Sequence, residues 1–333
     1  MEFMKLYDFE VNMDDDEEDV ENIYDRRKFH RIMFYIPEIL KIESLSGKKY
    51  YEDNTEKLVC MLQDYIEYVK TIPKTGNDNR LNRTIYVSLS KLLALLPEWV
   101  DSFDFIFQVI IERDVDITIH SHMVGEISKR IIEMIYRNNP SLLIGSLGLE
   151  SEEEVMENWP NVMEFVEKAG LIHDVGKVNI NHVTKKQTRR LTETEFMNIK
   201  KHPIYGGEMV SKVSHLKDFM PIIKGHHKSY DDKSGYPVEY KYRENENPLI
   251  VNIIQLADCL DATTDYVGRA YTYSKRYDEV LLEFEADKGT KYNPQLVDLM
   301  LKDKQFKEEI EELTTVGREE LCFELYNAYL SEE

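Results

Sequence analysis

Apolar residues recur along most of this chain at the spacing of one face of an α-helix. Two such stripes precede residue 100, and they are formed by Leu58, Met61, Leu62 and Ile66, and by Leu89, Leu92, Leu93 and Leu96. Recurrence every three to four residues is the main sequence signal of an amphipathic helix. The strict alternation that marks strands is sparse. The pattern therefore predicts an all-α protein.

The same pattern divides the chain into four parts. Residues 1–30 contain the acidic run from Asp14 to Asp19, which predicts a solvated, mobile segment. Residues 31–100 are expected to form a smaller helical module, which is also a candidate surface for a homodimer. Every candidate for chemistry falls in residues 101–314, the expected catalytic domain. Residues 315–333 are expected to form a C-terminal helix.

Composition limits the partners and the compartment. The chain has 63 acidic and 42 basic residues, a formal charge of −21, which disfavours duplex nucleic acid or an anionic membrane surface as a main partner. The three cysteines form no CxxC pair, which is typical of a reducing compartment. No apolar run approaches the roughly 20 residues that cross a bilayer, and the N-terminus has no signal-peptide pattern. We expect a soluble, cytoplasmic protein without membrane insertion.

The first candidate metal ligand lies on a helix whose apolar face carries Val124, Ile127, Ile131 and Ile135. His120 is four residues before Val124 and shares that buried face. His122 is about 200° further round by the helix period and should point to solvent. His120 is therefore the ligand candidate. Asp116, four residues earlier, is expected either to support or join it as a ligand, or to be a helix N-terminal carboxylate.

His173 and Asp174 close another amphipathic stretch. A carboxylate at the end of an apolar run is costly to bury unless a cation meets it. An imidazole next to a carboxylate suits Fe, Mn, Zn or similar ions, and the two oxygens of Asp174 can bridge two of them. Lys177, one turn further on, can reach a bound phosphate, and Gly176 permits a close approach of the backbone.

Three further histidines follow. A capping-box signature, Thr192 with Glu195, begins the helix that leads to His202. His226 and His227 are adjacent, and neighbouring side chains on a helix diverge by about 100°. They can therefore serve two neighbouring ions, or one can bind an ion while the other supports it.

A turn and a buried carboxylate complete the candidate set. Gly235, Tyr236 and Pro237 favour a tight turn, in which Tyr236 can stack on a base or bond a phosphate. Downstream, Pro248 suits the first turn of a helix whose buried stripe includes Asp258. A carboxylate among apolar neighbours needs a metal ion or a strong cation.

Taken in chain order, these residues resemble the HD-GYP branch of the HD superfamily of metal-dependent phosphohydrolases. The matching positions, between Asp101 and about Lys307, are His120, His173-Asp174 with Lys177, His202 with Pro203 and Gly206, His226-His227, Gly235-Tyr236-Pro237, Asp258 with Asp261, and Arg269. The resemblance implies an HD-type helical bundle that binds two or three divalent metal ions, usually iron or manganese. It also implies hydrolysis of a cyclic dinucleotide, foremost cyclic di-GMP to pGpG and then GMP.

The resemblance also implies roles for individual residues. Asp174 is expected to bridge two ions and, with Lys177, to take part in catalysis. The remaining metal ligands are expected to be His120, His173, His202, His226, His227 and Asp258, with Asp116 as an additional candidate. The expected substrate contacts are Lys177, Gly235, Tyr236, Pro237 and Arg269, of which Arg269 would clamp a phosphate.

Several positions depart from the family pattern. Lys228 stands where glutamate usually follows the paired histidines, Asp232 where glycine is usual, and Thr272 where a basic residue is usual. These changes fall on loops and substrate contacts rather than on the metal ligands, so they leave the substrate open. The alternatives are an HD-type phosphohydrolase for another nucleotide, such as cyclic GMP-AMP, and a signalling or scaffold module that binds a nucleotide with weak turnover or none.

Overall fold

The computed structural model describes residues 36–45, 55–72, 79–180, 182–185, 189–266 and 274–331. The predicted acidic segment at residues 1–30 lies outside these ranges, as do Arg269 and Thr272. Within them every regular element is a helix, and β structure is limited to two isolated bridges. The predicted all-α fold is confirmed.

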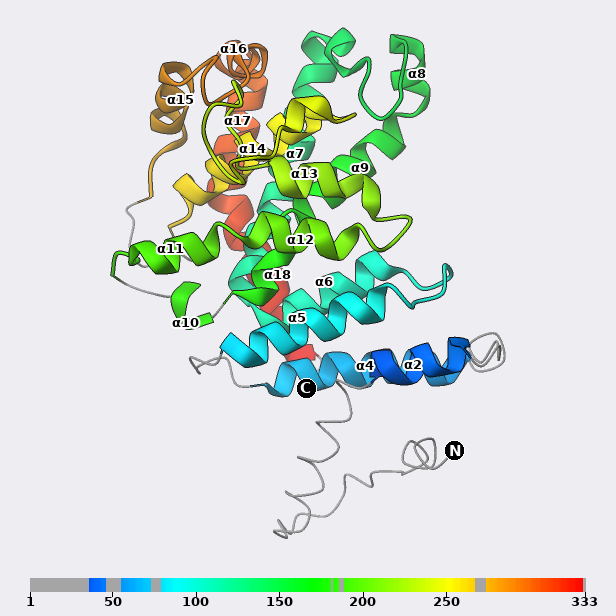
Figure 1. The fold of residues 1–333 in the computed structure, drawn as a ribbon. Helices are drawn as coiled ribbons and strands as arrows, with labels where there is room; N and C mark the ends of the chain where they lie inside the picture. The colour runs from blue at the N-terminus through cyan, green and yellow to red at the C-terminus, as the bar shows by residue number, and fades with distance from the viewer. Residues whose placement is uncertain are drawn as a thin grey trace.

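The described helices pack together as a bundle (Figure 1). In the first half of the chain they are α2 (Ile36–Leu45), α4 (Thr55–Thr71), α5 (Asn79–Leu93), α6 (Ser102–Arg113), α7 (Val115–Asn138), η2 (Pro140–Leu143), α8 (Glu152–Glu157), α9 (Trp159–Ile172) and η3 (Val175–Asn179). In the second half they are α10 (His182–Lys185), α11 (Glu193–Ile199), α12 (His202–Val210), η4 (Lys217–Phe219), α13 (Met220–Gly225), η5 (Tyr242–Glu244), α14 (Pro248–Thr264), α15 (Tyr277–Ala286), α16 (Pro294–Lys302), α17 (Lys304–Glu312), η6 (Leu313–Gly317) and α18 (Arg318–Ser331).

Helix α7 is the centre of the fold, and it packs against both α9 and α14. Its start is capped by Asp114, whose side chain accepts a hydrogen bond from the Ile117 amide. The crossing with α9 is close because glycines meet there: a Cβ on Gly170 would lie 2.6 Å from the Cα of Gly125. The contact brings the C-terminal end of α9 beside the polar middle of α7.

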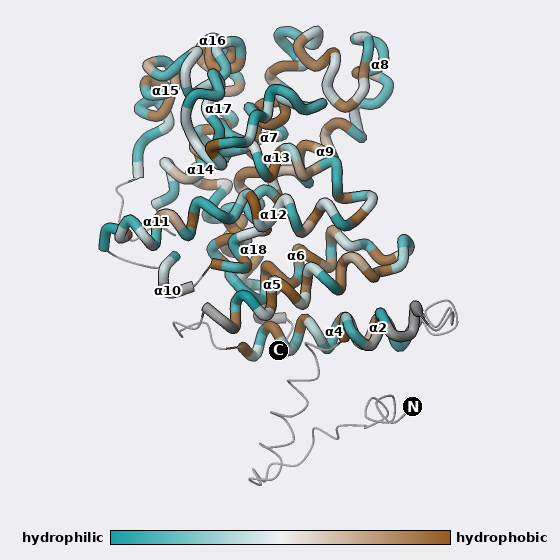
Figure 2. The backbone as a smooth tube through the Cα atoms, in the orientation of Figure 1, coloured by the Kyte–Doolittle hydropathy of each residue, from teal (hydrophilic) through white to brown (hydrophobic). Residues whose placement is uncertain are grey.

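One hydrophobic core runs through the described part of the chain. Its buried apolar side chains form a single cluster from Ile36 to Ile310. Figure 2 shows hydrophobic positions along α5 and α6, inside the bundle, and a largely hydrophilic α11 at its edge. In agreement, α11 contains no buried residue, although the capping box predicted at its start is present, with Thr192 and Glu195 bonded reciprocally.

The N-terminal helices lie directly against the expected catalytic domain. Helix α4 packs on α6, and α5 packs on η3 and α12. The buried Arg113 guanidinium ties the two parts together, since it donates to the Ile72 carbonyl at 3.0 Å and to Asn82 Oδ1 at 2.9 Å. These helices therefore support η3, the segment that carries Lys177. Their role in a homodimer stays a prediction.

The longest described helix, α7, has 24 residues, yet its middle buries the polar side chains His120, Ser121 and Ser128. No helix in the described ranges is both long and apolar enough to span a membrane.

Candidate metal centre

Seven histidine and aspartate side chains from separate elements meet in the middle of the bundle. They form two adjoining groups of candidate ligands, Asp174 with His202, His226 and His227, and His120 with His173 and Asp258. Within each group the ligand atoms lie within 4.8 Å of one another. These are the seven residues, apart from the additional candidate Asp116, that the sequence selected as ligands.

The local backbone explains why these side chains converge. Helix α9 ends at Ile172, so His173 and Asp174 occupy the turn that leads into η3. Gly176 follows in η3, where a Cβ would lie 2.0 Å from the carbonyl oxygen of His202. Only glycine allows η3 to approach the start of α12 so closely. That approach places His202 beside Asp174.

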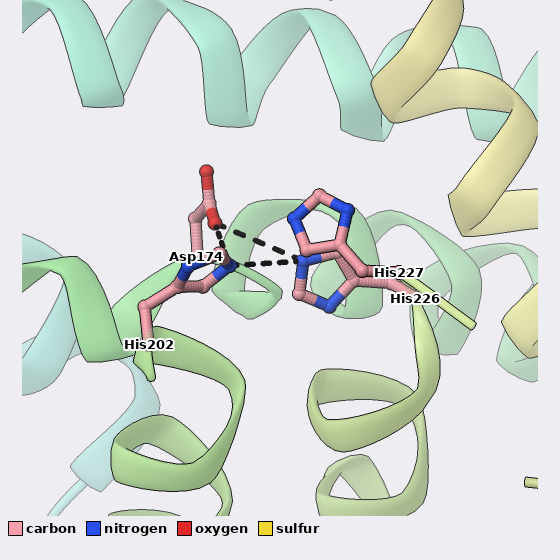
Figure 3. Close-up of side chains that lie close together, drawn as sticks. All are labelled: Asp174, His202, His226 and His227. Carbon is pink, nitrogen blue, oxygen red and sulfur yellow. Dashed lines mark hydrogen bonds and ion pairs between the residues drawn. The ribbon is translucent and has the colours of Figure 1, made fainter. Parts of the chain in front are cut away.

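Asp174 belongs to the first group, where one of its carboxylate oxygens faces His202 and His226 (Figure 3). Its other oxygen faces the second group. Its Oδ1 is 3.0 Å from His202 Nε2 and 3.9 Å from His226 Nε2. Its Oδ2 is 3.4 Å from Nε2 of both His120 and His173. A carboxylate placed in this way can bridge two cations, as the sequence predicted for this residue.

Three of the histidines are held by backbone carbonyls three residues earlier in the chain. The pairs are His173 Nδ1 with Gly170 O at 2.6 Å, His202 Nδ1 with Ile199 O at 2.8 Å, and His226 Nδ1 with Ile223 O at 2.8 Å. A carbonyl oxygen can only accept, so each Nδ1 must carry the proton. In the neutral ring Nε2 is then left with a free lone pair, aimed at the centre.

These lone pairs lack hydrogen-bonding partners within the protein. His202 Nε2 and His226 Nε2 face one another at 3.2 Å, which juxtaposes two acceptors. The buried His173 Nε2 and Asp174 Oδ1 make no hydrogen bond. Acceptors buried without donors are costly, and a bound cation satisfies all of them. The residues present therefore fit divalent metal ions, with nitrogen and oxygen donors typical of iron, manganese or zinc.

The electrostatics of most of these ligands favours metal binding. Burial lowers the pKa of His173, lowers that of His226 well below its usual value, and lowers that of His227 to about 3. Burial also opposes the charge on Asp174, but Lys177 and the surrounding histidines outweigh it and hold the pKa of that carboxyl well below its usual range. At neutral pH these three imidazoles are neutral and the carboxylate is charged, the forms that bind metals.

His120 differs from the other histidines because carboxylates surround it. Its Nδ1 lies 2.6 Å from Asp261 Oδ2, and its Nε2 lies 3.2 Å from Asp258 Oδ1. Burial works against a charged ring, but the hydrogen bonds to Asp174, Asp258 and Asp261 outweigh it and raise the pKa of His120 to about 10. In the metal-free protein His120 is therefore protonated at neutral pH.

We expect metal binding to release about one proton from His120, because the ion must displace the proton on Nε2 before that atom can coordinate. Since the raised pKa lies above neutrality, metal affinity should rise as pH increases through the neutral range. Calorimetric titration of the metal-free protein with Mn²⁺ at pH 7, in two buffers of different ionisation enthalpy, measures the released protons. Binding without proton release, or with the same release in His120→Gln, would contradict this expectation.

The neighbours of His120 and His122 differ from those expected from α7 alone. Asp116 lies in the first turn of α7, where its alternative role is that of a helix N-terminal carboxylate, and it is not a member of either ligand group. The carboxylate that bonds His120 Nδ1 is Asp261, which the sequence indicated only as a position matching the family pattern beside Asp258. His122 does not point freely into solvent, since it is half-buried with its ring edge-on to Phe107 at 5.2 Å. A single helix period could not foresee these neighbours from α14 and α6.

The side chains of His226 and His227 do not diverge as neighbouring side chains within a helix do. Helix α13 ends at Gly225, so His226 and His227 lie in the turn beyond it. Their ring centroids are 4.1 Å apart, and both fall in the group that contains Asp174. His227 Nδ1 also lies 3.6 Å from Asp258 Oδ2, which links it to the second group. The 100° divergence does not apply because the helix has already ended.

Solvent reaches the centre from one side. The side chains of His173, His202 and His226 are fully or almost fully buried, whereas His227 is 23% exposed, Asp258 13% and Lys177 20%. Lys177 forms an ion pair with Asp174 across this opening. Lys177, which the sequence predicted to meet a phosphate, therefore lies beside Asp174.

The Gly235-Tyr236-Pro237 turn covers the same side. Gly235 has φ +86°, and a Cβ there would lie 2.1 Å from the carbonyl oxygen of His227. The Tyr236 amide donates to that carbonyl at 3.1 Å, and the Tyr236 ring packs 4.5 Å from the His227 ring. Lys200, which the sequence did not single out, has its Nζ 5.6 Å from the Tyr236 ring centroid. The turn thus presents an aromatic ring and a cation next to a metal-ligand candidate.

The residues that depart from the family pattern shape this loop. Lys228 is buried, and its Nζ donates to the Val238 carbonyl at 3.2 Å, while its own carbonyl accepts from Gln255. Asp232 has φ +58°, a conformation that glycine adopts more readily, which explains why glycine is usual there. Lys228 therefore braces the loop internally, instead of placing its charge at the ligand groups.

The middle of the chain is similar to a known protein family. The family model described as HD domain matches residues 117–263. The matched range begins on α7, just before His120, and ends on α14, after Asp258 and Asp261. It therefore contains every member of the two ligand groups.

Curated proteins that are similar to this chain are named as cyclic dinucleotide phosphodiesterases. A cyclic di-GMP phosphodiesterase of Thermotoga maritima is 30% identical over 65% of this chain and 55% of its own. The cyclic di-GMP phosphodiesterase response regulator RpfG of Xanthomonas campestris pv. campestris is 32% identical over 51% of this chain and 42% of its own. The 3'3'-cGAMP-specific phosphodiesterase 2 of Vibrio cholerae is 30% identical over 41% and 26%. The chain thus spans about half, or less, of the length of these relatives.

Proposed function

We propose that this protein is a metal-dependent phosphodiesterase that hydrolyses a cyclic dinucleotide, foremost cyclic di-GMP to pGpG and then GMP. The observation that carries the proposal is Asp174, whose two oxygens face different members of two adjoining groups of candidate ligands. Relatives named as cyclic di-GMP phosphodiesterases support the choice of substrate.

The donor set favours two or three divalent ions, with iron or manganese preferred. Five imidazoles and two carboxylates supply nitrogen and oxygen donors, and no cysteine belongs to either group. Such donors suit iron, manganese and zinc, whereas calcium and magnesium prefer oxygen alone. When bound, the ions would lower the pKa of a water molecule and offset charge on the phosphate.

The protein side chains at the mouth would hold and orient the substrate. Lys177, which pairs with Asp174, would meet a phosphoryl oxygen and offset the charge that develops during attack. The Tyr236 ring, which packs beside His227, would order a base or a phosphate at the open side. Arg269 stays a predicted phosphate contact. The ion groups also explain how a chain of charge −21 can bind an anion, because cations reverse the field locally.

Two observations support cyclic GMP-AMP as an alternative substrate. Lys228 replaces the glutamate usual after the paired histidines, and it braces the loop beside the open side of the site. A relative at 30% identity is named as specific for 3'3'-cGAMP. Cyclic GMP-AMP is therefore the alternative substrate of the same proposed site.

One experiment separates these possibilities. The protein is purified anaerobically, its bound metal is quantified, and cyclic di-GMP, cyclic GMP-AMP and a generic phosphodiester are assayed beside Asp174→Ala. Two or more ions with cyclic di-GMP turnover that disappears in Asp174→Ala is the expected result. Preferred turnover of cyclic GMP-AMP selects the alternative substrate. Tight nucleotide binding without hydrolysis under any metal indicates a binding module, and a protein that binds no metal rules out the proposed enzyme.

Tyr236→Phe is expected to raise KM for the cyclic dinucleotide by about 10-fold, the value of one hydrogen bond to a charged group. The phenol hydroxyl would be lost, while the ring contact with His227 would remain. Metal content should therefore be unchanged, and steady-state kinetics with metal quantification tests both points. An unchanged KM would mean that the hydroxyl does not touch the substrate.

A further inference from the structure

Arg318, at the start of α18, is a fully buried cation close to the metal centre. Its side chain is only 1% exposed, and Nη2 lies 2.6 Å from Oδ1 of Asp261, which is equally buried. A buried guanidinium is retained only where its partners are well placed. The ion pair between Arg318 and Asp261 therefore joins the C-terminal helix to α14.

Asp261 divides its two oxygens between Arg318 and the metal centre. Oδ1 receives Arg318 Nη2, and Oδ2 lies 2.6 Å from His120 Nδ1. The ring of His120 then presents Nε2 to Asp174 and Asp258. A continuous series of contacts therefore runs from α18, through one carboxylate on α14, to a candidate ligand on α7.

The remaining contacts of Arg318 fall on the same turn of α14. Nη2 lies 3.4 Å from Thr264 Oγ1 and 3.5 Å from the Asp261 carbonyl, and Nη1 lies 3.6 Å from Asp265 Oδ1. This turn follows directly after Asp258, the candidate ligand on α14. The Arg318 guanidinium thus contacts both the carbonyl and the carboxylate of Asp261, the residue that bonds His120.

Arg318 directly follows an unusual helical turn. Between α17 and α18, residues Leu313–Gly317 form a π-helix, η6, and Thr314 within it is buried. Such turns are rare and occur often at functional sites, since the wider turn redirects the side chains that follow. Here the residue that follows immediately is Arg318.

We propose that Arg318 is a positioning residue of the metal centre, which acts through Asp261 on the orientation of His120. This inference rests on the proposed metal site. Groups that orient a ligating histidine govern metal affinity together with the ligand itself. The C-terminal helix thereby becomes part of the metal-binding machinery, although none of its described residues belongs to a ligand group.

The test is Mn²⁺ affinity, measured by equilibrium dialysis and by the EPR signal of bound Mn²⁺. We expect Arg318→Met to weaken binding at the site containing His120 by on the order of 10-fold, and Arg318→Lys to weaken it less, because the charge is kept and the planar fork is lost. Arg137→Met is the matched control, since Arg137 pairs with Asp303 and Glu309 between α7 and α17, away from the ligand groups. It should bind Mn²⁺ like the wild type.

A double-mutant cycle distinguishes positioning from general packing. If Arg318 acts through Asp261, combining Arg318→Met with Asp261→Asn should cost little more Mn²⁺ affinity than Asp261→Asn alone. Additive losses would overturn the proposal. So would Arg318→Met and Arg318→Lys variants that melt at lower temperature but bind Mn²⁺ like the wild type.

The failure of this inference differs from that of the proposed function. A wild-type protein that binds no Mn²⁺ or Fe²⁺ removes the metal site, and with it both proposals. A wild type that binds metal beside unaffected Arg318 variants removes only the role of Arg318. Should Arg318→Met fail to fold, Arg318→Lys decides: it must show weaker Mn²⁺ binding than Arg137→Met for the proposal to stand.

Discussion

Replacing Asp174 with asparagine is expected to reduce phosphodiesterase turnover by on the order of 10³-fold, the scale on which removal of one electrostatic catalytic group acts. The two carboxylate oxygens face different ligand groups, at 3.0 Å from His202 Nε2 and 3.4 Å from His120 Nε2. Asparagine keeps the shape and one oxygen but replaces the other with an NH₂ donor, which cannot bind a cation. The variant should therefore keep fewer bound ions than the wild type.

Metal analysis and turnover of the same preparations test this prediction together. Asp298→Asn is the matched control, because Asp298 is half-exposed and pairs only with Lys288, far from the ligand groups. It should match the wild type in both measurements. Full metal content with lost activity in Asp174→Asn would place Asp174 in catalysis without a bridging role. Full activity would remove it from the site.

Gly176→Ala is expected to lower the free energy of unfolding by about 3 kcal/mol, the upper end of the usual cost of overpacking. A methyl group there would lie 2.0 Å from the His202 carbonyl oxygen and 2.6 Å from the Gly206 amide nitrogen. Both are backbone atoms, so η3 and α12 would have to separate. Because the same approach brings Asp174 to His202, metal affinity should fall as well.

Gly207→Ala is the control for this prediction, one residue beyond Gly206 on α12. The atoms nearest to its methyl group would all belong to the side chain of Lys224, which can turn away. Urea unfolding and Mn²⁺ binding of the two variants give the comparison. Gly176→Ala with the stability of Gly207→Ala would mean that the contact between η3 and α12 relaxes freely, and that the glycine is not what positions His202.

Local pattern was sufficient to find the ligands that lie on helices. His120 and Asp258 were selected by their place on buried stripes of α7 and α14, and the structure buries His120 and leaves Asp258 only 13% exposed. A polar residue on an apolar stripe is conspicuous in any sequence because burial without a partner is costly. Helix periodicity predicts which side chains share a face within one helix, but it predicts nothing beyond the ends of that helix.

Where the reasoning failed, a helix ended or a second helix intervened. His226 and His227 lie side by side because α13 ends at Gly225. Asp116 has the right spacing to support His120, yet Asp261, 141 residues away in sequence, takes that place. Arg318 carried no local signal, since a single arginine in a terminal helix normally faces solvent.

The sequence by itself determined the helical fold, because helix periodicity acts over a few residues. It also indicated the seven candidate ligands, through the cost of burying polar groups and through the resemblance to the HD-GYP branch. The tertiary structure alone decided which ligand atoms share a group, which oxygen of Asp174 faces which group, and that Asp261 and Arg318 support His120. Those facts depend on how α7, α9, α12, α14 and α18 pack together. Such contacts join residues far apart in the chain, and no local spacing specifies them.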